Sequence, residues 1–281
     1  MSQPTLVFSH ANGFPAGTYR LLFEQWRAAG WRVEAVEKLG HDPRWPVSSN
    51  WPKLREQLIH FIEGLQAGGP VVLVGHSLGG FLSLLVSSRR PDLARAVLLL
   101  DSPVIAGWKA QTLRVVKATP LIRQVSPSRV ARKRREYWAS REACLAHYAS
   151  KPLFARWDPR VLADYVAAGT QPDPNDPRGG VRLAFDRQVE AQIYDSLPHH
   201  VEQLLHRHPL RCPLGFIGGS HSAEVRQVGL AATRRLCHGH LRTIEGSHLF
   251  PMERPDDTAQ AVLRMLDELL AGTAPGVAQA A

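Results

Sequence analysis

Residues 71–80 read VVLVGHSLGG, and this stretch decides the fold. Four apolar, mostly β-branched residues predict a buried strand, and the apolar run that continues to Ser88 predicts a helix. Ser77 lies at the junction, with Gly75 and Gly79 two positions to either side. A sharp strand-to-helix turn lifts such a serine above the sheet edge, at the positively polarised N-terminus of the helix. We therefore predict that Ser77 is a nucleophile, which requires a nearby base and a site that stabilises an oxyanion.

The pattern on both sides of this stretch alternates between short apolar runs and amphipathic segments. Segments that end at Gly30 and near Leu65 repeat their apolar residues every three or four positions, as do segments 223–236 and 258–270. These are expected to be helices. The expected strands are residues 5–9, 31–36, 71–74, 96–100, 214–217 and 241–244. This alternation predicts an α/β fold with a mostly parallel central sheet flanked by helices.

The alternation stops near Gly107 and resumes after about residue 207. The interval contains helical patterns, basic residues and three tryptophans, so we interpret 107–207 as a helical cap inserted into a core made of 1–106 and 208–272. Residues 273–281 are expected to be a disordered tail.

Bulk composition excludes several classes of protein. The chain has 281 residues, a hydrophobic content of 44% and no apolar run of the roughly 20 residues that a membrane span needs. Three widely spaced cysteines and the lack of a secretory signal favour the cytoplasm. The formal net charge is +9, and the dense run 132–135 is more typical of a solvated helix face than of a nucleic-acid site. Attraction to an anionic substrate or lipid surface is the alternative.

Three motifs resemble those of the α/β-hydrolase superfamily in order and spacing. They are HANGFP at 10–15, GHSLGG at 75–80 and GSH at 246–248. The resemblance runs from Thr5 to Leu270, apart from the insertion, and the first motif is similar to that of a group of bacterial hydrolases. It implies the α/β-hydrolase fold, with His248 as the catalytic base.

The resemblance also implies an oxyanion hole made of two backbone N–H groups. One belongs to Leu78, which follows the nucleophile. The other belongs to Asn12 if His10 aligns with the histidine of the family's H-G-x motif, and to Phe14 if the alignment starts at Gly13. We favour Asn12.

The acid of the triad departs from the usual family pattern. The position where most members carry an aspartate, after the strand at 214–217, holds His221. Asp101 follows the strand at 96–100, and some members carry the acid there, so we take Asp101 as the acid. Glu224 is the alternative, although a glutamate in the first turn of a helix has a sufficient explanation in the helix dipole. A third alternative is that neither carboxylate serves.

The function implied is hydrolysis of a carboxylic ester or thioester of a small molecule through an acyl-serine intermediate. We expect no cofactor and no nucleic-acid partner. We also expect no metal, because the histidines at 199, 200, 206 and 208 lack a complementary set of ligands. Alternatives on the same machinery are acyl transfer and cleavage of a carbon–carbon bond. A non-catalytic binding protein is a further alternative, since fold does not fix function. The sequence carries no signal for the oligomeric state.

Overall fold

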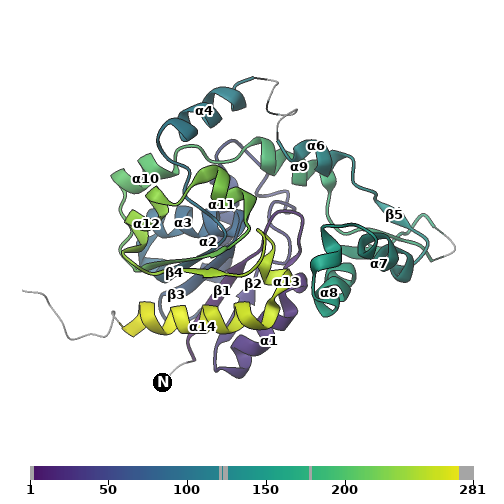
Figure 1. Ribbon diagram of the computed structural model, residues 1–281, viewed down its shortest axis with the longest axis horizontal. Helices are drawn as coiled ribbons and strands as arrows, with labels where there is room; N and C mark the ends of the chain where they lie inside the picture. Colours follow the sequence, from purple (N-terminus) through teal and green to yellow (C-terminus); the bar gives the residue numbers. More distant parts are fainter. Residues whose placement is uncertain (1–2, 120–121, 123–125, 177–178, 272–281) are drawn as a thin grey trace, which may run out of the picture.

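A six-stranded parallel sheet forms the centre of the protein (Figure 1). The computed structural model describes residues 3–119, 122, 126–176 and 179–271. The strand order is β2-β1-β3-β4-β8-β9, with every neighbouring pair parallel. The strands are β1 (Thr5–Ser9), β2 (Arg32–Ala35), β3 (Val71–His76), β4 (Ala94–Leu100), β8 (Leu214–Gly219) and β9 (Leu241–Ile244). The predicted fold class is confirmed.

Side chains that alternate along the strands supply two hydrophobic cores, one on each face of the sheet. On one face, Phe8 and Leu98 pack with α1 (Arg20–Ala28) and α14 (Pro255–Ala271). On the other, Val7 and Leu99 pack with α2 (Pro52–Gly64), α3 (Leu78–Arg89) and α12 (Ala231–Cys237). Figure 1 shows α1 and α14 together on one side of the sheet, with α2, α3 and α12 on the other. Both faces of the sheet are therefore buried, as its continuous apolar strands require.

The segment between β4 and β8 contains helices and a second sheet. Its helices are α4 (Gly107–Lys117), α6 (Ser128–Arg132), α7 (Arg141–Ala149), α8 (Pro159–Gly169), α9 (Arg187–Asp195) and α10 (Val201–Arg207), with the 3-10 turn η3 (Phe154–Arg156). Three short antiparallel strands, in the order β5-β7-β6, join them: β5 (Tyr137–Trp138), β6 (Thr170–Pro172) and β7 (Val181–Leu183). No sequence pattern predicted this sheet, because strands of two or three residues are too short to show a period of two.

This segment shares a core with the parallel sheet. Trp138, Tyr148, Trp157 and Tyr165 belong to the same continuous cluster as Phe8. Helix α8 packs against the 3-10 turn η1 (Ala16–Tyr19), which follows β1. The segment is therefore anchored on the loop after β1, while its treatment as a separate cap at 107–207 stays a prediction.

The remaining elements are short. The helix predicted at 223–236 is two helices, α11 (Ala223–Val228) and α12, because Gly229 breaks it with a φ of +81°. The 3-10 turn η2 (Pro91–Leu93) precedes β4, and α13 (Phe250–Glu253) precedes α14. The predicted tail at 273–281 lies outside the described residues. Within the described ranges, every helix falls short of the length and apolarity needed to cross a membrane.

Candidate active site

Ser77 occupies a strained turn between β3 and α3. Its backbone has φ +53° and ψ −112°, a region that costs energy for any residue with a side chain. The Ser77 N–H donates to the carbonyl of Leu100, 3.0 Å away at the end of β4. A Cβ atom on Gly79 would lie 1.9 Å from the carbonyl oxygen of Ser9, so only glycine lets α3 approach the sheet this closely. The turn predicted from the sequence is therefore the one that the structure contains.

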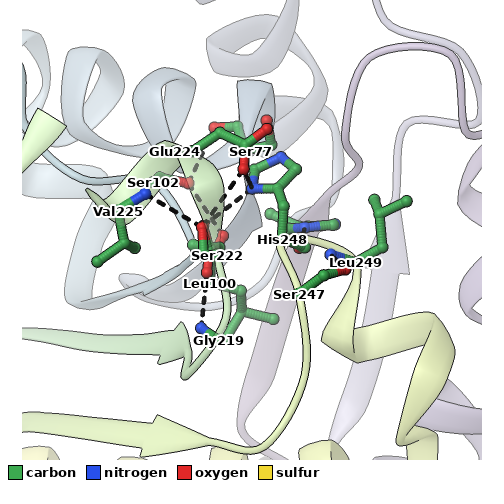
Figure 2. Close-up of polar contacts among 12 residues, drawn as sticks. Ser77, Leu100, Ser102, Gly219, Ser222, Glu224, Val225, Ser247, His248 and Leu249 are labelled. Atoms are coloured by element: carbon green, nitrogen blue, oxygen red, sulfur yellow. Dashed lines mark hydrogen bonds and ion pairs between the residues drawn. The ribbon is translucent and has the colours of Figure 1, made fainter. Parts of the chain in front are cut away.

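Asp101 lies at the end of β4 and is buried, with only 1% of its surface exposed. Its Oδ2 accepts a hydrogen bond from the Gly219 N–H at 2.7 Å, and its Oδ1 accepts one from the Ser222 hydroxyl at 2.6 Å. The Nδ1 of His248 is 2.9 Å from the same Oδ1. Figure 2 shows Gly219, Ser222 and His248 close together at this site. An ionised carboxylate only accepts hydrogen bonds, so the Nδ1 of His248 carries the proton.

His248 lies in the loop between β9 and α13. Burial acts to lower the pKa of His248, but the hydrogen bond to Asp101 and the negative charges of Glu224 and Asp101 outweigh it and raise that pKa above its usual value. The carbonyl of His248 is 2.9 Å from the Nε2 of His76. Two contacts therefore position His248: its Nδ1 is hydrogen-bonded to Asp101, and its backbone carbonyl is hydrogen-bonded to His76.

Glu224 is a second carboxylate beside the same nitrogen. Its Oε2 lies 3.7 Å from the Nδ1 of His248, and 48% of its side chain is exposed. It stands in the first turn of α11, whose N-cap is Ser222. The structure thus brings both candidate acids to His248, with Asp101 closer and fully buried. Asp101, Glu224 and His248 also offer ligand atoms within 4.8 Å of one another, and such a donor set could hold a cation.

A buried chain of hydrogen bonds, which the sequence analysis did not find, runs behind this site. The Ala11 N–H donates to the hydroxyl of Tyr19 at 3.1 Å, and that hydroxyl is 2.8 Å from the Nδ1 of His76. Because the His248 carbonyl can only accept, the Nε2 of His76 is protonated and its Nδ1 accepts from Tyr19. Burial lowers the pKa of His76 to about 3, so the ring stays neutral. The only sequence signal for these hydrogen bonds was the position of His76 directly before Ser77.

His10 holds the loop after β1 in shape. Its Nδ1 donates to the carbonyl of Ala11 at 2.8 Å, and its Nε2 accepts the Leu39 N–H at 2.8 Å. Burial lowers the pKa of His10 to about 4. The N–H of Phe14 donates to the carbonyl of Ala11 at 3.2 Å. In contrast, no acceptor for the N–H groups of Asn12 and Leu78 is found among the residues that the structure describes.

The segment between β4 and β8 supplies the wall next to this loop. Arg134 pairs with Glu190 at 2.6 Å, and their side chains are only 14% and 7% exposed. The guanidinium also contacts the hydroxyls of Tyr148 and Tyr165. The ion pair packs closely against the loop after β1. A Cβ atom on Gly13 would lie 2.6 Å from Oε1 of Glu190, so this position has no room for a larger residue.

This burial corrects the expectation of a solvated face at 132–135. Lys133 and Arg135 are exposed, as predicted, but Arg134 faces inward, because Glu190 offers it a buried counter-charge. A run of basic residues carries no information about an acidic partner more than fifty positions away, so the sequence pattern did not reveal the pair.

Known proteins resemble this chain in sequence and in fold. The model of the "Alpha/beta hydrolase family" matches residues 6–261. The mouse protein "Monoglyceride lipase" is 30% identical over 130 residues, which is 44% of this chain and 43% of that protein, so the match spans under half of that relative. "Monoglyceride lipase homolog" of Monkeypox virus is 25% identical over 70% of this chain and 82% of its own length.

A solved structure shows the same architecture. The crystal structure of E-2-(acetamidomethylene)succinate hydrolase superposes with a TM-score of 0.74 at 22% identity, covering 94% of this chain and 91% of that one. At this identity the likeness concerns the fold, while the family match covers most of the sequence. The chain belongs to the alpha/beta hydrolase family.

Proposed function

We propose that the protein is a serine hydrolase that cleaves a carboxylic ester of a small molecule. The observation that carries the proposal is the 2.9 Å hydrogen bond between Asp101 and the Nδ1 of His248. The carbonyl of His248 is also hydrogen-bonded to His76, the residue directly before Ser77. The bond to Asp101 leaves the Nε2 of His248 unprotonated and available to take a proton. The names of the lipase relatives support an ester as the substrate class.

In the proposed mechanism, the Ser77 hydroxyl attacks the scissile carbonyl while its proton passes to the Nε2 of His248. Asp101 stabilises the resulting imidazolium. The N–H groups of Leu78 and Asn12 bind the oxyanion. His248 then gives its proton to the departing alcohol, which leaves an acyl-serine. A water molecule, deprotonated by His248, attacks this ester and releases the acid, and the proton returns to Ser77.

Asp101 is the better acid in this scheme. Its carboxylate is closer to the Nδ1 of His248 and is positioned by two further donors, Gly219 and Ser222. Glu224 is exposed and 3.7 Å away, so its interaction is weakened by solvent. Glu224 therefore acts on His248 through its charge.

Asn12 is the better second oxyanion donor for a similar reason. The N–H of Phe14 already donates to the carbonyl of Ala11 within the turn, whereas the described residues offer no acceptor to the N–H of Asn12. A donor that is already hydrogen-bonded in the resting protein is not available to the oxyanion in the transition state, and this favours Asn12 over Phe14.

The scheme needs neither a cofactor nor a metal. Thioester hydrolysis, acyl transfer and carbon–carbon bond cleavage use the same residues and remain alternatives, as does a non-catalytic binding role. We retain residues 107–207 as a cap in this proposal. A cytoplasmic location stays a prediction from the sequence.

Labelling with a fluorophosphonate probe tests the proposal. We expect one covalent adduct on Ser77, located by peptide mass spectrometry, and none in the Ser77→Ala variant. A panel of p-nitrophenyl esters and acyl-CoA thioesters, assayed with and without added alcohol, separates hydrolysis from acyl transfer. Failure of Ser77 to react with the probe, in a protein that is folded by circular dichroism, contradicts the hydrolase proposal.

A further inference from the structure

The side chain of Asn12 has one polar atom for which the described part of the chain offers no partner. Its Nδ2 donates to the carbonyl of Glu190 at 2.9 Å. Its Oδ1 is buried, and no hydrogen-bond donor for it is found among the described residues. Only 4% of Asn12 is exposed. A buried acceptor without a donor is unfavourable, so a position of this kind indicates a group that is supplied from elsewhere.

The orientation of this amide is determined by its surroundings. If the amide were rotated by half a turn, Oδ1 would face the carbonyl of Glu190, and two acceptors would oppose each other. The Glu190 carbonyl therefore holds Nδ2 on the side of α9, and Oδ1 is left as an acceptor without a donor among the residues that the structure describes.

Tyr194, also on α9, stands beside Asn12. The Asn12 side chain and the charges of Glu190, Arg134 and Glu224 all act on the pKa of its hydroxyl, so Tyr194 is a neighbour of the Asn12–Glu190 contact. Burial raises the pKa of Tyr194, so the hydroxyl keeps its proton. No acceptor for that proton is found within the described part of the chain.

We propose that Asn12 and Tyr194 form a subsite for a hydroxyl group of the substrate, close to the scissile carbonyl. This inference rests on the proposed function and specifies its substrate class. A hydroxyl donates one hydrogen bond and accepts others, so it can donate to Oδ1 of Asn12 and accept from Tyr194 at the same time. An ether or keto oxygen only accepts, and a carboxylate would oppose both Oδ1 and the charge of Glu190.

The position of the hydroxyl on the substrate follows from two roles of Asn12, one for its backbone N–H and one for its side chain. In the proposed mechanism its backbone N–H binds the oxyanion, so its side chain lies within one residue of the reacting carbonyl. The hydroxyl is therefore expected on a carbon only a few bonds from the ester, on either the acyl or the alcohol side. Preferred substrates would be hydroxy-acid esters or partial esters of polyols.

Matched substrate pairs test this directly. Ethyl 3-hydroxybutyrate against ethyl butyrate probes the acyl side, and 2-hydroxyethyl butyrate against ethyl butyrate probes the alcohol side. We expect the kcat/KM of one hydroxylated member to exceed that of its partner by about tenfold or more, because a site that hydrogen-bonds a hydroxyl leaves buried groups unpaired with the analogue. The Asn12→Leu and Tyr194→Phe variants should each reduce this ratio toward one.

Two further measurements keep the result unambiguous. Tyr137→Phe is a matched control, because Tyr137 is 57% exposed on β5, and it should leave the ratio unchanged. Binding of the same pairs to Ser77→Ala, followed by saturation-transfer NMR, tests the hydroxyl preference without turnover, so failure of the hydrolase proposal can be told apart from failure of the subsite. Equal turnover and equal binding of both members in each pair would overturn the subsite, as would a preference that survives both variants.

Discussion

The two walls of the Ser77 site are built on different principles. The wall formed by the parallel sheet brings Asp101 and His248 together at its carboxyl edge, and both oxygens of Asp101 have donors. The wall formed by α9 contains a buried ion pair, Arg134–Glu190, next to an amide oxygen on Asn12 that has no donor among the described residues. We call the first the saturated wall, because both oxygens of Asp101 are hydrogen-bonded within the protein. Among the described residues, the second wall leaves the Oδ1 of Asn12 open.

This difference separates positioning from recognition. A group whose hydrogen bonds are all made within the protein is held in one geometry, which suits the proposed proton transfer. An atom left open contributes to binding only when a ligand completes it, which suits discrimination between substrates.

The largest effect is expected from the carboxylate of the saturated wall. Asp101→Asn should lower kcat/KM by about 10³–10⁴-fold, because an amide no longer stabilises the imidazolium and permits the wrong tautomer of His248. Glu224→Gln is the matched control and should cost much less. Steady-state kinetics with a p-nitrophenyl ester measures both, and a greater loss in Glu224→Gln would assign the acid to Glu224 instead.

The buried ion pair of the other wall should matter for stability. Arg134→Met leaves the Glu190 carboxylate buried without its counter-charge, and removing one partner of such a pair costs about 3–5 kcal/mol. Urea denaturation measures the free energy of unfolding. Arg242→Met is the control, since its pair with Glu268 is 54% and 39% exposed and is expected to contribute about 1 kcal/mol or less. Equal losses in the free energy of unfolding in the two variants would show that the Arg134–Glu190 pair stabilises the fold no more than an exposed pair does.

A smaller effect is expected from the hydrogen-bond chain behind the saturated wall. Tyr19→Phe removes the donor to His76 and the acceptor for the Ala11 N–H, which loosens both the loop after β1 and the backbone of His248. The loss of a buried hydrogen bond costs about 1–3 kcal/mol of stability. We expect about 1.4 kcal/mol of this to appear in the activation barrier, which lowers kcat about tenfold. Tyr137→Phe again serves as the control. An unchanged kcat in Tyr19→Phe would show that the chain does not position the site.

The smallest effect concerns pH. The proposed base must be unprotonated, so activity should rise with pH through the pKa of His248, which Asp101 and Glu224 raise. Glu224→Gln removes one negative charge, lowers that pKa and shifts the rise of kcat/KM to lower pH. His76 and His10 also lie near, but burial holds their pKa values at about 3 and about 4, below this range. The shift should shrink in high salt, because Glu224 is half exposed; a shift to higher pH would contradict this electrostatic account.

The sequence by itself determined the parallel α/β core and the turn at Ser77. These follow from local rules, because a buried parallel strand is a continuous apolar run and only glycine permits the close approach at Gly79. The place of His248 came from the order of motifs along the chain. The sequence also offered Asp101 and Glu224 as candidate acids, beside the alternative that neither serves. Local patterns say nothing about which carboxylate reaches a histidine more than a hundred residues from Asp101.

Only the tertiary structure decided the relations between distant residues. It placed Asp101 at 2.9 Å and Glu224 at 3.7 Å from the Nδ1 of His248 and turned Arg134 inward toward Glu190. Within the described ranges, it left the Oδ1 of Asn12 without a donor. The physical reason is that burial and hydrogen bonding depend on which segments meet in space. The periodicity that predicts a helix or a strand extends over a few residues, whereas the polar atoms around Ser77 are satisfied, or left unsatisfied, by partners from β4, α9 and the loop after β9.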